Sequence, residues 1–308
     1  MIDIVGRRYL YFLISAIVIV PGLIGLALWG PPPAAIDFTG GSLLEVRSQG
    51  LQRPDPAEVV AVAEAQGITG ALVQTAGETD LVIRTKPLED GQKSALVEAL
   101  QAEAGAPLTV LRHEHVGPSV GAEVAQRALG AVALAVLGIL VYITAAFRGL
   151  PHAMRYGVAA ILAMLHDVMV VVSAQVLLGH LLGWEVDALF LTALLTVIGF
   201  SVHDTIVVFD RIRENQRLLR RLPYATLVNH SIVQTLGRSI NTQLTVLLTL
   251  LALLLFGGVT TRHFVSVLLI GVLSGTYSSI FNAAPILVVW ENREWRTWLR
   301  RGRAPGNA

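Results

Sequence analysis

The chain has 308 residues, of which 54% are hydrophobic and only 15% are charged, and its formal net charge is +1. Soluble domains average about 25% charged residues, so this composition favours a membrane protein whose surface largely faces lipid. The chain has no cysteine, which excludes disulfides, thiolate metal sites and cysteine nucleophiles.

Six apolar stretches are long enough to cross a bilayer as helices, which takes about 17–25 residues. They lie at residues 10–29, 128–147, 156–178, 186–209, 239–256 and 264–290. The apolar core of the first stretch is longer than that of a signal peptide, so we expect it to stay as an anchor. Outside the long first loop, Lys and Arg gather on one side of the spans, and the two short loops on the other side hold only Arg262. By the positive-inside rule, both termini are expected in the cytoplasm.

Residues 31–125, between the first two spans, have mixed polarity and are expected to fold outside the cytoplasm. Four stretches have strand-like patterns, two have helical spacing, and residues 76–79 are typical of a hairpin turn. The expected strands are 42–47, 70–75, 80–85 and 108–116, and the expected helices are 55–66 and 88–104. The order βαββαβ matches the ferredoxin-like motif, which by itself implies no activity.

The predicted fold is a polytopic α-helical membrane protein with six transmembrane helices and one extracytoplasmic ferredoxin-like α+β domain. Its expected parts are residues 1–30 with the first span, the outer domain at 31–125, the bundle at 126–291 and a basic cytoplasmic tail at 292–308. His113 and His115 alternate on one face of the last expected strand. We interpret them as exposed histidines rather than metal ligands, and we predict no metal site and no cofactor.

Asp204 lies inside the fourth span, where a charged carboxylate costs roughly 2.5–3.5 kcal/mol and is usually paired or functional. Arg238, at the start of the fifth span, carries the opposite charge. One interpretation is a static ion pair between the two. The other is that their separation changes with conformation. Asp204 would then alternately bind and release a proton, because a nearby guanidinium favours the charged carboxylate and burial favours the neutral one.

Other spans also carry polar residues. His166 and Asp167 lie in the middle of the third span, either as an internal polar contact or as a second protonatable station. In the fifth span, a polar stripe on one helical face is expected to meet protein or water rather than lipid. It consists of Arg238, Thr242, Thr245 and Thr249, with Asn241 beside it.

Gly271 and Gly275 form a Gly-x-x-x-Gly motif in the sixth span, which allows helices to approach closely. We interpret it as a packing site, with the wall of a transport pathway as the alternative. Residues 224–237, ahead of the fifth span, are amphipathic and are expected to form a helix on the inner membrane surface. The adjacent His166 and Asp167 lack the spacing of the two histidines and one glutamate in helical zinc peptidases, which disfavours an intramembrane enzyme.

Several strings together resemble one family, the SecF subunits of the bacterial Sec protein-export machinery, within the resistance-nodulation-division superfamily. The strings are residues 36–41 (IDFTGG), 116–121 (VGPSVG), 196–215 (TVIGFSVHDTIVVFDRIREN), 234–242 (QTLGRSINT), 256–258 (FGG) and 275–281 (GTYSSIF). They occur in the order of the family and cover nearly the whole chain.

The resemblance implies a subunit of the cytoplasmic membrane without covalent catalysis. Such a subunit works with a homologous SecD partner beside the SecYEG channel and uses the proton gradient to help complete export. Further implied partners are YidC-type accessory proteins, the unfolded polypeptide in transit and the lipid bilayer, but no nucleic acid.

In the family pattern, Asp204 and Arg238 are the transmembrane charges tied to proton use. The chain departs from that pattern at His203, where asparagine is usual, which raises the question of whether His203 joins the proton path. Asn282, in the sixth span, is also polar where a small or apolar residue is expected.

The first string contains Asp37, Phe38, Gly40 and Gly41. We interpret it as a tight junction between the first span and the outer domain, because glycine allows backbone angles that other residues avoid. Pro118, flanked by Gly117 and Gly121, is expected to form the returning junction.

Two other classes of function stay open at this point. One is an exporter of small molecules or lipids from the same superfamily, although such proteins usually carry twelve spans and two large outer domains in one chain. The other is a structural subunit that stabilises the channel without a proton path.

Overall fold

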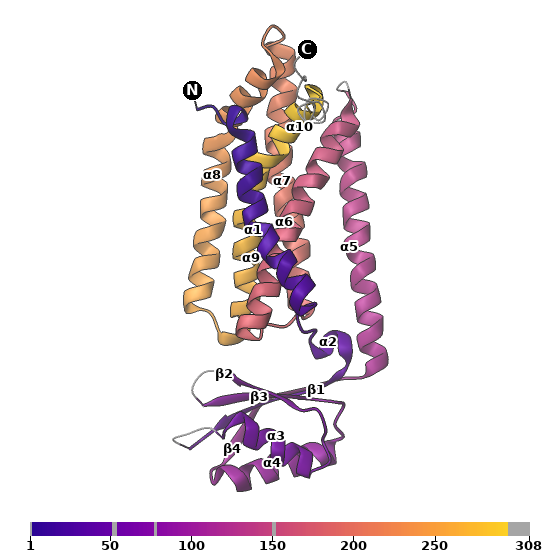
Figure 1. Ribbon diagram of the computed structural model, residues 1–308, viewed down its shortest axis with the longest axis vertical. Coiled ribbons are helices and arrows are strands. Elements are labelled where there is room, and N and C mark those ends of the chain that lie inside the picture. The colour runs from indigo at the N-terminus through magenta and orange to yellow at the C-terminus, as the bar shows by residue number, and fades with distance from the viewer. Residues whose placement is uncertain (1, 51–53, 77–78, 150–151, 295–308) are drawn as a thin grey trace, which may run out of the picture. The chain divides into compact units, whose positions relative to one another are not determined.

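The computed structural model describes residues 2–50, 54–76, 79–149 and 152–294 (Figure 1). They fall into two compact units. A helical unit takes the described parts of Met1–Pro32, Ala131–Trp184 and Leu189–Ala308. The second unit, which we call the outer unit, takes those of Pro33–Gly130 and Glu185–Ala188. The predicted fold class is confirmed. Of the predicted basic tail at 292–308, residues 295–308 lie outside the described residues.

Six helices of the described chain are long and apolar enough to cross a membrane. In chain order they are η1 with α1 (Val5–Arg7 and Arg8–Trp29), α5 (Pro118–Ala146), α6 (Ala153–Leu182), α7 (Ala188–Leu218), α8 (Tyr224–Phe256), and α9 with η2 and α10 (Val259–Ser278, Ser279–Ala283 and Ala284–Glu291). The sixth is continuous through η2, a single turn of π-helix. Such turns are rare in proteins as a whole, and many of those that occur lie at functional sites.

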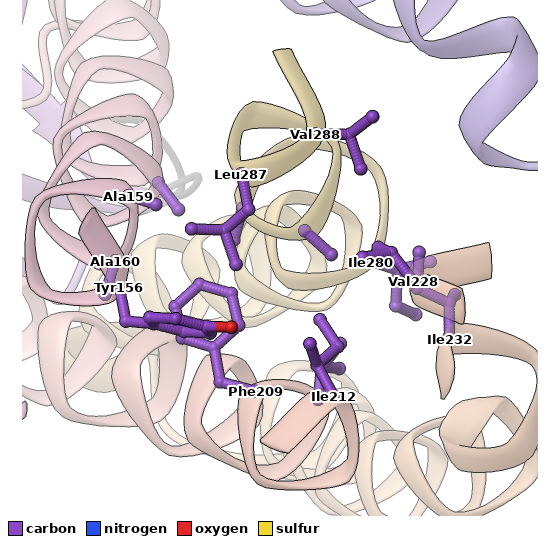
Figure 2. Close-up of a cluster of buried hydrophobic side chains, with 14 of the residues drawn as sticks. Tyr156, Ala159, Ala160, Phe209, Ile212, Val228, Ile232, Ile280, Leu287 and Val288 are labelled. Atoms are coloured by element: carbon purple, nitrogen blue, oxygen red, sulfur yellow. The ribbon is translucent and has the colours of Figure 1, made fainter. Parts of the chain in front are cut away.

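The helical unit has an apolar core to which α6, α7, α8, η2 and α10 contribute side chains (Figure 2). Tyr156 of α6 and Phe209 of α7 meet edge to face with ring centroids 5.3 Å apart, and Phe147 stacks on Tyr156 at 5.4 Å. Leu287 of α10 and Val228 of α8 belong to the same buried cluster. Because lipid tails are as apolar as these side chains, close packing rather than water exclusion holds such a core together.

This core contradicts one prediction from the sequence. Residues 224–237 do not form a separate surface helix but are the first turns of α8, which is one helix of 33 residues. Val228 and Ile232 are fully buried in the core, and Asn229 accepts hydrogen bonds from the backbone N–H groups of Ile4 and Val5. The amphipathic pattern was real, but its apolar face packs on protein instead of on lipid.

The outer unit has the predicted ferredoxin-like order. Its elements are α2 (Ile36–Thr39), β1 (Gly41–Ser48), α3 (Pro56–Ala65), β2 (Leu72–Ala76), β3 (Asp80–Thr85), α4 (Asp90–Ala104) and β4 (Leu108–Val116). The sheet order is β2-β3-β1-β4, with every neighbouring pair antiparallel. The β2–β3 hairpin forms as expected, although residues 77–78 of its turn lie outside the described residues.

The core of this unit follows from strand alternation. Leu44 and Val46 of β1 and Leu81 and Ile83 of β3 are at most 1% exposed, because every second side chain of a strand points to the same face. The helices α3 and α4 cover one face of the sheet (Figure 1). Asp55 caps α3 through a capping box with Glu58, which fixes where that helix starts.

Candidate functional site

Asp204 and Gln243 connect α7 to α8 inside the helical unit. Asp204 is 2% exposed, and its Oδ2 accepts a hydrogen bond of 2.6 Å from Nε2 of Gln243, which is itself 4% exposed. Among the described residues, Gln243 is the one hydrogen-bond donor to this carboxylate. A buried charged carboxylate normally needs a cation or several donors to replace its lost hydration, so the site is poorly equipped for the charged form.

Further polar atoms on the same two helices are buried without a hydrogen-bond partner in the described part of the chain. They are the hydroxyl oxygens of Ser201 and Ser239 and the amide oxygen of Gln243. Ser201 precedes Asp204 by about one turn on α7, and Ser239 precedes Gln243 by about one turn on α8. Since buried polar atoms are nearly always paired, these atoms leave hydrogen-bonding capacity unused on the two helices that carry Asp204 and Gln243.

Arg238 does not pair with Asp204. The two residues form no ion pair within 4 Å, and no salt bridge of Arg238 to any described residue is found. Arg238 is exposed and instead lines a cavity of about 220 Å³, together with Asp210, Arg211 and Glu214. The static ion pair expected as one alternative is therefore wrong for this structure, in which an amide takes the place of the guanidinium. Proton coupling between the two stays a prediction.

Three other predicted site residues, His203, Asn241 and Thr242, lie on exposed faces of the helices. The hydroxyl of Thr242 donates to the backbone carbonyl of Arg238, and those of Thr245 and Thr249 donate four residues back in the same way. The polar stripe of α8 is thus satisfied by its own helix and does not reach Asp204.

Asp167 is a second buried carboxylate, and it is 0% exposed. It accepts hydrogen bonds of 2.6 Å from the hydroxyls of Ser274 and Ser278 on α9, and its Oδ1 lies 3.0 Å from Nδ1 of His166. His166 Nε2 is buried with no described partner, and its ring stacks on Tyr277. The predicted His166–Asp167 pair is thus part of a network that links α6 to α9.

Gly271 and Gly275 place α9 against α7. A Cβ atom on Gly271 would lie 2.1 Å from Cγ2 of Val197, and one on Gly275 would lie 3.3 Å from Cα of Ser201. One face of α9 therefore binds Asp167 while another lies beside the Asp204 helix. Near its end, Asn282 of η2 donates to Oγ of Ser15 on α1, which gives this unexpected polar residue a contact inside the bundle.

The string that contains Asp37, residues 36–41, lies near the start of the outer unit. Gly40 and Gly41 have φ angles of +73° and +139°, a region that favours glycine. A Cβ on Gly40 would lie 2.7 Å from Cα of Pro118, and one on Gly121 would lie 2.8 Å from the backbone nitrogen of Gly40. The two predicted junctions therefore pack directly on each other inside the outer unit. Phe38 donates its backbone N–H to Ala35.

Residues 185–188, which lead into α7 and include its first residue, Ala188, also belong to the outer unit and form what we call the strap. Val186 accepts from the N–H of Ala35 and donates its own to the carbonyl of Pro33, both at 2.8 Å. Oδ2 of Asp37 accepts from the N–H of Ala188 at 2.8 Å. That contact caps the N-terminus of α7, where a negative charge is favourable. The helix that carries Asp204 therefore begins on the outer unit.

An ion pair of 2.8 Å joins Glu185 of the strap to Arg84 of β3. Burial raises the pKa of Glu185 to about 7; Arg84 opposes this rise, and the carboxylates of Asp187 and Asp37 add to it. Burial likewise lowers the pKa of Arg84, against the attraction of Glu185 and Asp187. The strap thus carries a carboxyl group that titrates near neutral pH.

Several of these contacts were not predicted from the sequence. Gln243 is a polar residue one turn after Ser239 in an apolar span, a spacing that could have placed it beside Asp204. Ser274 fits the small-residue face of the sixth span. Arg84 and Glu185 lie 101 positions apart, so that only the tertiary structure reveals their pairing.

Comparison with known proteins identifies relatives along the whole chain. Residues 96–293 match the family model described as protein export membrane protein SecD/SecF, C-terminal. The chain is 55% identical to the protein translocase subunit SecF of Anaerolinea thermophila over 309 residues, which cover all of both chains. It is 41% identical over 266 residues to the protein translocase subunit SecDF of Thermus thermophilus, covering 84% of this chain and 34% of that one.

A solved structure agrees with the fold. The crystal structure of SecDF from Thermus thermophilus, described as a translocon-associated membrane protein, superimposes with a TM-score of 0.82 at 36% identity. The match covers 94% of this chain and 39% of that chain. This chain thus spans about two fifths of the SecDF chain.

Proposed function

The chain belongs to the SecF family of protein translocase subunits, and on that premise we propose that it assists protein export together with a SecD-type partner. It is a multi-pass membrane protein, and the proposed site is the cytoplasmic membrane with both termini inside. The support for the partner is that the Thermus SecDF relative carries the matching region within one longer chain.

The exposed polar stripe of α8 supports a partner as well. Asn241, Thr242, Thr245 and Thr249 face outward from the single chain together with Arg238. A face with a guanidinium and four polar side chains is poorly suited to lipid. A homologous six-span subunit would cover it, and the SecYEG channel, YidC-type proteins and the exported polypeptide are then the further partners.

We infer that the subunit couples export to the proton gradient through Asp204. The observation that carries this inference is the lone hydrogen bond from Gln243 to a carboxylate that is 2% exposed. When Asp204 is charged, the amide of Gln243 donates to it. When Asp204 is protonated, the carboxyl becomes a donor, and the amide oxygen of Gln243 can accept after the amide rotates. The pair therefore has two arrangements that differ by one proton.

The two arrangements place different demands on Arg238. The charged carboxylate attracts the guanidinium from its cavity toward the bundle, and the neutral carboxyl leaves it outside. Movement of α8 against α7 would follow each proton. Since α7 begins at the strap, whose backbone is bonded to Pro33 and Ala35, motion of α7 is passed along the chain to the outer unit.

Export into membrane vesicles, measured with and without a proton gradient, tests this proposal. We expect Asp204→Asn to lose the gradient-dependent part of export while the chain still co-purifies with its SecD-type partner. Glu123→Gln is the control, because Glu123 is an exposed carboxylate of α5 that pairs with Arg127 and does not line the cavity of Arg238. Full gradient-dependent export by the Asp204→Asn variant would favour a purely structural subunit.

A further inference from the structure

A cavity of about 320 Å³ lies in the helical unit where α6 and α8 begin and where α7 and α10 end. Its size is at the lower end of the range of about 300–1,000 Å³ that is usual for ligand sites. It is separate from Asp204, Asp167 and the cavity of Arg238, which share no lining residue with it.

The depth of this cavity follows from helix length. The 30 residues of α6 extend about 45 Å at 1.5 Å per residue, whereas the hydrocarbon core of a bilayer is about 30 Å thick. The first turn of α6 and of the even longer α8 therefore reaches the level of lipid headgroups. His152, which precedes α6, and Tyr224, which begins α8, both line the cavity.

The lining of the cavity carries a net positive charge. Arg155 is paired with Glu291, so these two charges largely cancel. Arg220 also lines the cavity, is exposed, and has no ion pair with a described residue. One guanidinium is thus left over for an anion.

His152, another residue of the lining, has a φ of +61°. This conformation is uncommon outside glycine; it costs energy and persists where the surrounding structure enforces it.

Two tyrosine hydroxyls, those of Tyr156 and Tyr224, come from residues that line the same cavity as Arg220. The hydroxyl of Tyr156 accepts a hydrogen bond of 2.9 Å from Nε2 of Gln216, and its oxygen lies 3.4 Å from that of Tyr224. Since each hydroxyl can also donate, one proton of this pair is available to an acceptor in the cavity. The lining also has an apolar part, which we call the leucine wall and which consists of Leu222, Leu227 and Leu287.

We propose that this cavity binds the phosphate group of an anionic glycerophospholipid. A guanidinium and hydroxyl donors match phosphate oxygens, the leucine wall matches the start of an acyl chain, and the depth matches the headgroup layer. A soluble phosphate compound would match the guanidinium and the hydroxyl donors, but it would match neither the leucine wall nor the depth of the cavity. This inference is independent of proton coupling, because none of its residues takes part in the proposed proton path.

Native mass spectrometry of the full chain in detergent tests the proposal, with phosphatidylglycerol and phosphatidylcholine added in turn. We expect the chain to retain phosphatidylglycerol preferentially and Arg220→Gln to weaken retention roughly fivefold. Arg221→Gln is the matched control, because the neighbouring Arg221 is also exposed but does not line the cavity. Tyr224→Phe, which keeps the ring and removes only the hydroxyl, should also weaken retention.

Three results would overturn the proposal. Equal losses in Arg220→Gln and Arg221→Gln would indicate a general basic surface. Equal retention of the two lipids would show that the headgroup charge is not recognised. Displacement of phosphatidylglycerol by millimolar inorganic phosphate would show that the site takes free phosphate and that the lipid is not its ligand.

Discussion

Two aspartates lie buried in the helical unit, and they differ in the number and kind of their hydrogen-bond donors. Asp167 receives two short hydrogen bonds from hydroxyls and has a histidine at 3.0 Å, whereas Asp204 receives one hydrogen bond from an amide. Both are at most 2% exposed. Burial alone therefore does not distinguish a structural carboxylate from one that exchanges a proton, as we propose for Asp204. On this proposal the number of donors distinguishes the two, because a fully supplied carboxylate has little reason to change its protonation or its partners.

The largest expected effect on stability is at Asp167. Asp167→Ala removes two short hydrogen bonds and leaves the buried hydroxyl of Ser274 without a described acceptor, whereas Ser278 keeps the carbonyl of Gly275; the change should cost about 3 kcal/mol in the free energy of unfolding. Asp167→Asn keeps one acceptor oxygen and should lose clearly less. Unfolding of the purified protein in mixed micelles measures both. A stability of Asp167→Ala equal to that of Asp204→Ala would erase the contrast between the two sites.

A smaller loss is expected at Gln243. Gln243→Leu removes the one described donor to Asp204 and should cost about 1–3 kcal/mol. The control is Gln126→Leu, the same substitution at an exposed glutamine of α5; it should change stability by less than about 0.5 kcal/mol. We also expect Gln243→Leu, but not Gln126→Leu, to reduce gradient-dependent export. Equal effects of the two substitutions would argue against the Asp204–Gln243 pair as the functional element.

The close packing of α9 against α7 can be tested separately. Helix α9 contacts both helices that carry a buried aspartate, α6 with Asp167 and α7 with Asp204. Gly271→Ala introduces a methyl group against Val197 and should cost about 1–3 kcal/mol by overpacking. In Gly237→Ala the added methyl group meets no atom within 4 Å. That substitution should be neutral or stabilising by up to about 1 kcal/mol. The unfolding measurement above distinguishes them, and an unchanged stability of Gly271→Ala would mean that α7 and α9 are not tightly packed.

An effect confined to one pH window is expected at Glu185, a third carboxyl group that lies outside the spans. Its pKa is raised to about 7 in the folded protein, from an ordinary value of 4.5. Between these two values the folded state holds a proton that the unfolded state has released. The stability due to this group is therefore complete below about pH 4.5 and is lost as the pH rises through about 7.

The melting temperature of the wild type relative to Glu185→Gln should accordingly fall between about pH 4.5 and pH 7 and level off above. Glu64→Gln, an exposed carboxylate of α3 in the same unit, corrects for general charge effects. A difference that rises with pH would mean that the ion pair with Arg84 outweighs burial.

The sequence predicted the spans and the ferredoxin-like order well, because both depend on local patterns of polarity. It also identified Asp204 and Asp167, because charged residues are rare in apolar spans. It failed for residues 224–237, where an amphipathic pattern cannot reveal whether the apolar face meets lipid or protein. It paired Asp204 with Arg238 by charge, by the position of Arg238 at the start of its span and by the family resemblance, whereas Gln243, about one and a half turns further along α8, meets the carboxylate directly.

The strap could not be predicted in the same way. Its backbone hydrogen bonds to Pro33 and Ala35 need no particular side chains, so they leave no trace in the sequence. Asp37 belonged to a recognisable string, but its contact with Ala188 spans 151 positions. Such contacts between distant segments are visible only once the chain is folded.

The protonation of Asp204 itself can be measured most directly by infrared difference spectroscopy of the complex with a SecD-type partner while the pH is stepped. We predict that the carboxyl carbonyl band that changes with pH includes a part that is lost in Asp204→Asn but is kept in Glu185→Gln, which removes the other carboxyl group expected to titrate near pH 7, and in Glu123→Gln, an exposed control on α5. A titrating carboxyl band of equal size in the wild type and in Asp204→Asn would contradict proton exchange at this residue.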